Sequence, residues 1–137
     1  MRTDREQDEP ASVGTDGGAL IAQLWEALER DDLAHAGDLV TDDFVMAWPQ
    51  SGERFSGRDR AIAAIRAQDE KPEPAGEPRI IGSGDVWVAL VPIRYGSVTH
   101  QYVGVFELSA GKIARATEVF GAPFPPKEAR ARFADTA

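Results

Sequence analysis

The hydrophobic pattern of the C-terminal half of the chain constrains the fold more than any other feature. Its longest apolar run, Val86–Tyr95, is apolar at both alternating positions over most of its length, so we expect a strand that is covered on both faces. Turn dipeptides follow at Gly96-Ser97 and at Ala110-Gly111, where the chain can reverse its direction. The sequence therefore predicts consecutive antiparallel strands over residues 79–83, 86–95, 99–109 and 112–121.

The N-terminal half has mainly helical spacing. Residues 18–40 carry an apolar stripe with a helical period, and Asp31-Asp32 interrupts it, which predicts two helices. Alternating residues up to Trp48-Pro49 then indicate a strand, and Glu53-Arg54-Phe55 indicates a short return strand. One apolar face within residues 58–69 predicts a third helix. Helices that precede a run of antiparallel strands are typical of an α+β fold with the helices on one face of a curved sheet.

The length of 137 residues fits one domain, which we expect over residues 18–134. Residues 1–17 hold five acidic and two basic residues and no aromatic residue, so an acidic, disordered N-terminal arm is expected. The proline-rich segment 71–78 is expected to be a loop, and Lys127–Phe133 to form a short closing helix.

Charge and composition exclude several classes of partner. The net charge is -8, so we expect no nucleic acid partner and no binding to an anionic membrane surface. No apolar run approaches the ~18 residues of a membrane span, and the first residues lack a signal-peptide core, so a cytoplasmic protein is expected. The chain has no cysteine, and its two isolated histidines, His35 and His100, have no carboxylate at i+3 or i+4 spacing that completes a site. Neither a metal nor another cofactor is therefore expected.

Several short segments, in this order and spacing, carry a resemblance to a known family. The chain resembles the nuclear transport factor 2-like superfamily over about residues 19–133, and within it the SnoaL-like, or polyketide cyclase-like, domain proteins. The resemblance implies a cone-shaped fold in which three N-terminal helices pack on a curved mixed or antiparallel sheet around a pocket. The segments that carry it are Ala27–Leu33, Asp42–Val45, Trp48–Arg58, Phe106–Leu108, Gly111–Ile113 and Val119–Phe124.

The same resemblance places three residues where ketosteroid isomerases carry catalytic groups. The oxyanion-hole tyrosine, the general-base aspartate and the second oxyanion donor of those enzymes fall at Leu24, Trp48 and Gly104. That isomerisation needs a base beside hydrogen-bond donors for the enolate oxygen. Ketosteroid isomerisation is therefore not expected of this chain. The likeness also implies a cis peptide bond between Trp48 and Pro49.

One ionisable group, Glu118, is expected inside the implied pocket. Because the last strand alternates, Ala114, Ala116, Glu118 and Phe120 share the face that the resemblance directs inward. Burial without a cation raises the pKa of a carboxyl group, which makes Glu118 the candidate general acid or base. Two alternatives remain open: an arginine such as Arg66, Arg94 or Arg115 pairs with Glu118 and lowers its pKa, or a one-residue slip turns it to solvent.

Residues around Glu118 are candidates for ligand contact, either as walls of the cavity or at its mouth. Aromatic residues at these positions are equally consistent with a plain cavity wall, turn chemistry alone explains the glutamine, and the histidine can be an exposed one. The candidates are Trp48, Gln50, Arg54, His100, Tyr102, Phe106 and Phe120, with Gly104 on the same face.

Three functions fit these observations. The first is a cofactor-independent cyclase, isomerase, dehydratase or hydrolase that acts on a small apolar or aromatic molecule. The second is a module that binds such a ligand without chemistry. The third is a dimerising interaction domain. All three are compatible with a homodimer through the outer face of the sheet, where we expect Val88, Leu90, Pro92, Val103 and Val105.

Overall fold

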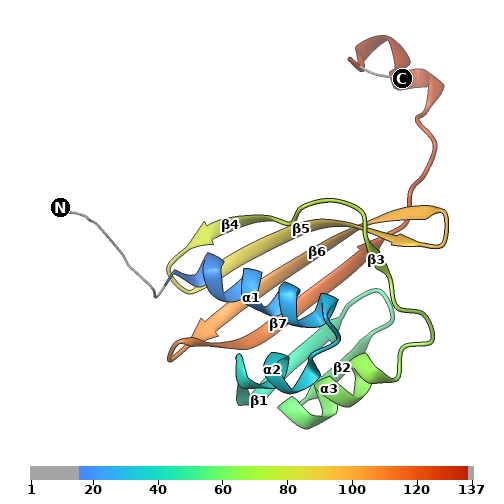
Figure 1. The fold of residues 1–137 in the computed structure, drawn as a ribbon. Coiled ribbons are helices and arrows are strands. Elements are labelled where there is room, and N and C mark those ends of the chain that lie inside the picture. The colour runs from blue at the N-terminus through green and yellow to red at the C-terminus, as the bar shows by residue number, and fades with distance from the viewer. Residues whose placement is uncertain (1–15, 136–137) are drawn as a thin grey trace.

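The computed structural model describes residues 16–135 and has α+β architecture, with helices on one face of a curved, seven-stranded sheet (Figure 1). The arm expected over residues 1–17 lies almost wholly outside the described residues. In chain order the elements are α1 (Gly17–Glu29), α2 (Leu33–Asp38), β1 (Val40–Trp48), β2 (Glu53–Ser56), α3 (Arg58–Arg66), β3 (Glu73–Pro74), β4 (Arg79–Ser83), β5 (Val86–Tyr95), β6 (Val98–Ser109), β7 (Lys112–Gly121) and the 3-10 helix η2 (Glu128–Phe133).

The sheet runs in the order β2-β1-β7-β6-β5-β3, and β4 also pairs with β5. All neighbouring strands are antiparallel except β1 and β7, which are parallel. The predicted bounds of β4, β5 and β7 are confirmed. The expected loop over residues 71–78 contains the two-residue strand β3, since Glu73 and Pro74 pair with Arg94 and Ile93 of β5.

Helix α1 begins at Gly17, one residue earlier than the apolar stripe over residues 18–40 predicted. The Asp16 side chain caps the helix by accepting a hydrogen bond from the Gly18 backbone N–H at 2.8 Å. At Gly17 the helix lies so close to Trp87 that a Cβ atom would collide with the indole ring. Glycine at this position therefore allows the start of α1 to pack directly on β5.

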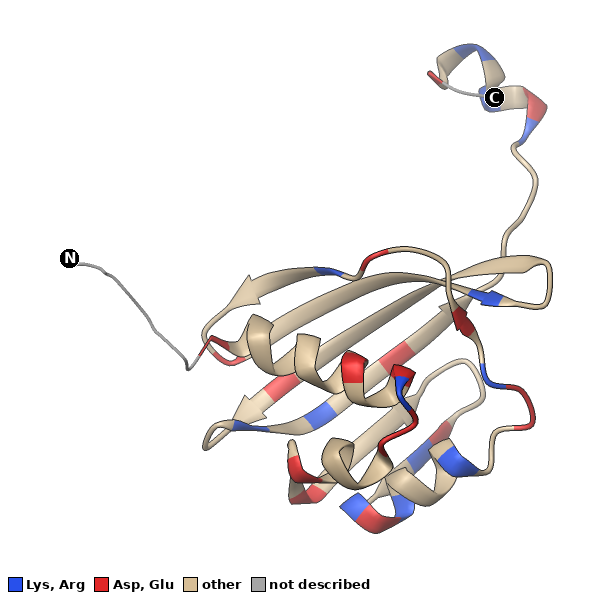
Figure 2. Cartoon of the chain, in the orientation of Figure 1, with Lys and Arg blue, Asp and Glu red and all other residues tan. Residues whose placement is uncertain are grey.

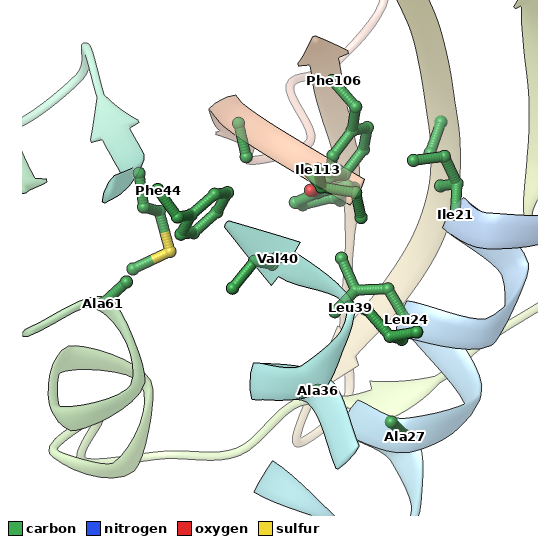
Figure 3. Close-up of a cluster of buried hydrophobic side chains, with 14 of the residues drawn as sticks. Ile21, Leu24, Ala27, Ala36, Leu39, Val40, Phe44, Ala61, Phe106 and Ile113 are labelled. Atoms are coloured by element: carbon green, nitrogen blue, oxygen red, sulfur yellow. The ribbon is translucent and has the colours of Figure 1, made fainter. Parts of the chain in front are cut away.

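The core fills the space between the helices and the sheet at one end of the molecule (Figure 3). Ile21 of α1, Phe106 of β6 and Ile113 of β7 are each no more than 1% exposed. Phe106 was expected to line the pocket, but it belongs to this core. Figure 3 shows it among the labelled side chains Ile21, Leu24, Ala27, Ala36, Leu39, Val40, Phe44, Ala61 and Ile113.

A β-bulge corrects the expected face of Ala114. The pairing of β6 and β7 shifts between Glu107 and Leu108, so Glu107 pairs with Arg115 whereas Leu108 pairs with Ile113. Ala114 is the extra residue, and simple alternation therefore fails on its N-terminal side. Ile113 is buried in the core instead, and the predicted inward face begins only at Ala116.

The other face of the sheet carries the apolar residues expected there. Val88 lies opposite Val105, and Leu90 lies opposite Val103, and all four side chains are half-buried. Val119, next to Val103 on β7, is 37% exposed. Within residues 16–135 no helix packs on this face (Figure 1).

One expectation for the backbone was wrong. No peptide bond in the described part of the chain is cis, so Trp48–Pro49 is trans. A turn still follows it, closed by hydrogen bonds from the backbone N–H groups of Ser51 and Gly52 to the Trp48 carbonyl.

Candidate functional site

A cavity of about 610 Å³ lies between the sheet and the C-terminal ends of α1 and α3. Its inner wall is mainly aromatic and aliphatic, and its other boundary comes from the turn after α1 and the segment around β3. The aromatic residues that line it are Trp25, Trp48, Tyr95, Tyr102 and Phe120, and Val91 and Ile93 of β5 add aliphatic surface.

Glu118 projects into this cavity from β7, between two hydrogen-bond donors on the neighbouring strands. The indole Nε1–H of Trp48 on β1 donates to Glu118 Oε1 at 3.0 Å. The hydroxyl group of Tyr102 on β6 donates to the other carboxylate oxygen, Oε2. Because each donor comes from a different neighbouring strand, the carboxylate is held from both sides and its orientation is fixed.

The ionisation of Glu118 reflects this environment. Burial raises the pKa of the carboxyl group above its ordinary value, and the hydrogen bonds from Tyr102 and Trp48 oppose that rise without cancelling it. Burial also raises the pKa of the Tyr102 phenol well above its ordinary value, and the charge of Glu118 adds to the effect. Tyr102 therefore stays protonated at neutral pH, and Glu118 exchanges its proton more readily near neutrality than an exposed glutamate.

The described part of the chain shows neither of the two alternatives for Glu118, an arginine partner or a side chain turned to solvent. No arginine or lysine in residues 16–135 forms an ion pair with it. Arg115 instead approaches Glu107, with 3.7 Å between Nε and Oε2, and Arg94 pairs with Glu73 at 2.9 Å. Glu118 thus faces the cavity, as the alternation of β7 predicted, and its pKa is raised by burial without a cation beside it.

Gly104 leaves the space that the Tyr102 side chain occupies. Gly104 pairs with Glu118 across β6 and β7 and faces the same side as Tyr102. A Cβ atom at position 104 would collide with the Tyr102 hydroxyl group and would lie 2.8 Å from the Phe106 ring. The absence of a side chain at 104 therefore lets the phenol reach the carboxylate.

The aromatic side chains of the cavity pack against one another edge to face. The Tyr102 ring lies 4.8 Å from Trp25 and 5.4 Å from Phe120, measured between centroids. Trp48 contacts Phe55 at 4.8 Å on the far side. Such contacts fix the rings and so preserve the shape of the cavity.

The remaining predicted residues lie around the cavity without lining it. Gln50 binds the backbone of Phe120 on both sides, since its amide donates to the Phe120 carbonyl at 2.8 Å and accepts from the Phe120 N–H at 2.6 Å. Arg54 is exposed on β2. His100 packs behind Tyr95, with the ring centroids 4.9 Å apart. Gln50 thus positions a cavity residue, and Arg54 and His100 are not among the lining residues.

Sequence reasoning missed part of the cavity. Trp25 lies on the apolar stripe of α1, and Tyr95 is the last residue of β5. Both positions look like ordinary core positions in the sequence, so only the size of their rings could have indicated a cavity wall. The charged residues at the mouth come from segments that look like ordinary surface in the sequence. They are Glu29, Asp31, Asp32, Arg66, Lys71 and Glu73.

Two negative findings concern the described residues. Residues 16–135 contain no group of three or more His, Cys, Asp or Glu side chains that could hold a metal ion. In the same part of the chain, every helix is too short or too polar to cross a membrane.

Comparison with known proteins places the chain among small α+β domains. The family model for the SnoaL-like domain matches residues 21–116. No curated protein sequence matches the chain significantly.

Solved structures with the same fold are numerous. An NTF-2 like protein of unknown function from Burkholderia xenovorans LB400 is 29% identical, with a TM-score of 0.76 over 87% of this chain and 93% of its own. A protein from Kribbella flavida DSM 17836, provisionally named a ketosteroid isomerase, is 18% identical, with a TM-score of 0.79 over 88% of each chain. An LEH-like epoxide hydrolase from M. tuberculosis is 21% identical, with a TM-score of 0.61 over 77% of this chain and 83% of its own.

Proposed function

We propose, from the premise that the chain belongs to the family of SnoaL-like domain proteins, that it binds a small apolar or aromatic molecule and transforms it by cofactor-independent acid–base chemistry. The observation that carries the proposal is Glu118, a carboxyl group with a raised pKa, held by two donors inside an aromatic cavity. A cyclase, isomerase, dehydratase or hydrolase needs such a group to move a proton at neutral pH. The names of similar structures, an isomerase and an epoxide hydrolase among them, support the proposal at the level of the fold.

The geometry indicates how a proton would move. The indole N–H of Trp48 can only donate, so it holds Oε1 of Glu118 as an acceptor in both protonation states. In the ionised state Glu118 takes a proton from the bound molecule, which keeps the electron pair of the broken bond. Once Oε2 carries that proton, the new O–H group of Glu118 donates a hydrogen bond to the Tyr102 oxygen. The Tyr102 O–H group is then free to turn toward the cavity. Tyr102 then donates to an oxygen of the bound molecule while Glu118 returns the proton to another atom.

Two alternative functions fit the same structure and involve no catalysis. A non-catalytic binding module would hold the same ligand in the same cavity. An interaction domain would use the apolar outer face of the sheet, where Leu90, Val103 and Val105 lie uncovered by any helix of the described chain. We propose that this face forms a homodimer in either case, because burial of such a face stabilises association.

Exchange of carbon-bound protons of a bound molecule for solvent deuterium tests the catalytic proposal without knowledge of the natural substrate. The protein is incubated in D2O with a panel of cyclic and aromatic ketones, and NMR follows deuterium incorporation at carbon. We expect exchange of at least one compound, and we expect Glu118→Gln to slow it at least 100-fold, as for loss of a general base. Glu107→Gln is the matched control, because Glu107 is an exposed carboxylate on the neighbouring strand. Ligand binding without exchange would favour the binding module.

A further inference from the structure

We infer that the molecule bound in the cavity is an organic cation, an ammonium ion that carries an aromatic or alkyl group. This inference rests on the proposed function and specifies its ligand. Two features of the cavity support it: the charges of its lining and the aromatic wall around its one internal carboxylate.

The lining of the cavity is more acidic than basic. Five of its residues carry a carboxyl group, and two, Arg66 and Lys71, carry a basic group. The ammonium group of Lys71 is already bound by protein groups at the mouth, where its Nζ lies 3.7 Å from Asp31 Oδ1 and 3.4 Å from the Glu29 carbonyl oxygen. Glu73 is paired with Arg94, and Asp32 lies 4.0 Å from Arg30, whereas Glu29, Glu118 and the basic Arg66 have no ion-pair partner within the described chain. An anion would meet net repulsion here, whereas a cation would be attracted.

Two helices direct their negative ends to the same mouth. Helix α1 ends at Glu29 and α3 ends at Arg66, and both residues line the cavity. A helix C-terminus carries a partial negative charge, but the last carbonyl groups of α1 are already hydrogen-bonded, by the backbone N–H groups of residues 30–32 and by Lys71. Lys71 donates to the Glu29 carbonyl at the end of α1, and Arg66 stands in the last turn of α3, so each helix end already faces a basic residue and adds little to the preference for a cation. Figure 2 shows acidic residues at this end of α1 and in the turn that follows.

The interior of the cavity offers contacts suited to a positive charge. Trp25, Trp48, Tyr102 and Phe120 line the wall close to Glu118. A cation next to aromatic faces is attracted by the negative electrostatic potential of the rings, most strongly where it is shielded from water. The Glu118 carboxylate has about four acceptor positions and uses two of them for Trp48 and Tyr102. The remaining positions are available to an ammonium group, which would also compensate the cost of burying the carboxylate.

A pair of probes of equal shape and different charge tests the inference. Phenyltrimethylammonium and tert-butylbenzene have the same outline, and only the first carries a charge. Trp25 and Trp48 line the cavity, so tryptophan fluorescence at pH 8 reports the binding of each probe. We expect phenyltrimethylammonium to bind at least tenfold more tightly than tert-butylbenzene, and benzoate to bind more weakly than both. Raising the salt concentration to 1 M should weaken binding of the cation and leave binding of the neutral probe unchanged or stronger.

A conservative variant connects the preference to the carboxylate. Glu118→Gln keeps an oxygen for the Trp48 donor, removes the charge, and replaces the oxygen that accepts from Tyr102 by an NH2 group that can donate to the Tyr102 oxygen instead. We expect it to lose most of the preference for the cation while it keeps its affinity for tert-butylbenzene, which also shows that the cavity is folded. Glu107→Gln, on the outer face, should retain the full preference.

The outcomes separate the inference from the proposed function. Equal or tighter binding of tert-butylbenzene by the wild type overturns the cationic ligand and leaves a cavity protein for neutral molecules. Binding of none of the three probes at millimolar concentration overturns both. An unchanged preference in Glu118→Gln also overturns the inference, because the cation would then be bound away from the carboxylate.

Discussion

The indole nitrogen of Trp48, at the end of β1, donates a hydrogen bond to the carboxylate of Glu118 on β7 across 3.0 Å. These two strands are the parallel pair of the sheet, and their register sets Ala47 opposite Thr117, so the next residues of both strands meet at the cavity. The bond favours the ionised carboxylate, and it therefore opposes the effect of burial on the pKa of Glu118.

Replacement of this donor should raise the pKa of Glu118 further. Trp48→Phe keeps an aromatic ring and removes the N–H group, so the ionised carboxylate loses one of its two donors. The pKa of Glu118, followed by NMR of its side-chain carboxyl carbon, is expected to be higher than in the wild type. Stability at pH 8 should fall by about 1–3 kcal/mol, as for loss of a hydrogen bond to a charged group. Trp87→Phe, whose indole bonds the Gly84 carbonyl outside the cavity, should leave the pKa of Glu118 unchanged.

The raised pKa predicts how stability depends on pH. The folded chain holds the Glu118 proton more tightly than the unfolded chain does. The stabilisation from the protonated form is complete below the unfolded pKa, and it is lost as the pH rises through the folded pKa. Urea unfolding of the wild type and Glu118→Gln over pH 4–8 measures the difference between the two proteins. The wild type should lose stability relative to the variant as pH rises, by at most about 1.4 kcal/mol per pH unit. A difference that grows in the opposite direction would contradict a raised pKa.

A methyl group at position 104 should disturb the site through overpacking. Gly104→Ala places a Cβ atom against the Tyr102 hydroxyl group and the Phe106 ring, so a loss of about 1–3 kcal/mol in the free energy of unfolding is expected. Gly37→Ala in α2 is the matched control, because its Cβ would meet only Arg58 Cδ at 3.6 Å. That control should be neutral or slightly stabilising, as helix propensity predicts. Thermal and urea unfolding of both variants provide the comparison.

The outer face of the sheet should determine the oligomeric state. We expect the wild type to sediment as a dimer at micromolar concentration. Val103→Asp puts a charge at the centre of the apolar outer face and should shift the protein to a folded monomer. Val98→Asp, at the exposed tip of the β5–β6 hairpin, should remain dimeric. Wild-type protein that sediments only as a monomer would disprove the dimer.

The sequence predicted the strands and the position of the carboxylate better than the extent of the cavity. The bounds of β5 and β7 were predictable because apolar runs end at glycines in positive-φ turns, Gly96 at 61° and Gly111 at 78°. The inward face of Glu118 followed from alternation on the C-terminal side of the bulge. The bulge at Ala114 has no signature in the hydrophobic pattern, so the face predicted for Ala114 was wrong.

The mouth of the cavity could not be predicted because helix packing creates it. Glu29 is far in the sequence from Arg66 and Glu73, and all three look like solvated surface. They line one cavity only because α1, α3 and β3 come together there. The two donors to Glu118, Trp48 and Tyr102, were both expected at the cavity, but nothing local in the sequence identifies the polar partner of a buried Trp or Tyr. That information lies in the strand order β1-β7-β6.

The parallel pairing of β1 and β7 also has a consequence for the order in which the chain can acquire its site. Trp48 and Glu118 are 70 residues apart, so their contact closes a long loop and is costly in chain entropy. During synthesis the helices and β1 leave the ribosome before β7 exists, and the wall that carries Trp48 must wait for the last strand. The hairpins of β5, β6 and β7 are local and can form first. Docking of β1 along the edge of β7 would then be a late event in folding, and ligand-binding capacity would emerge only with it.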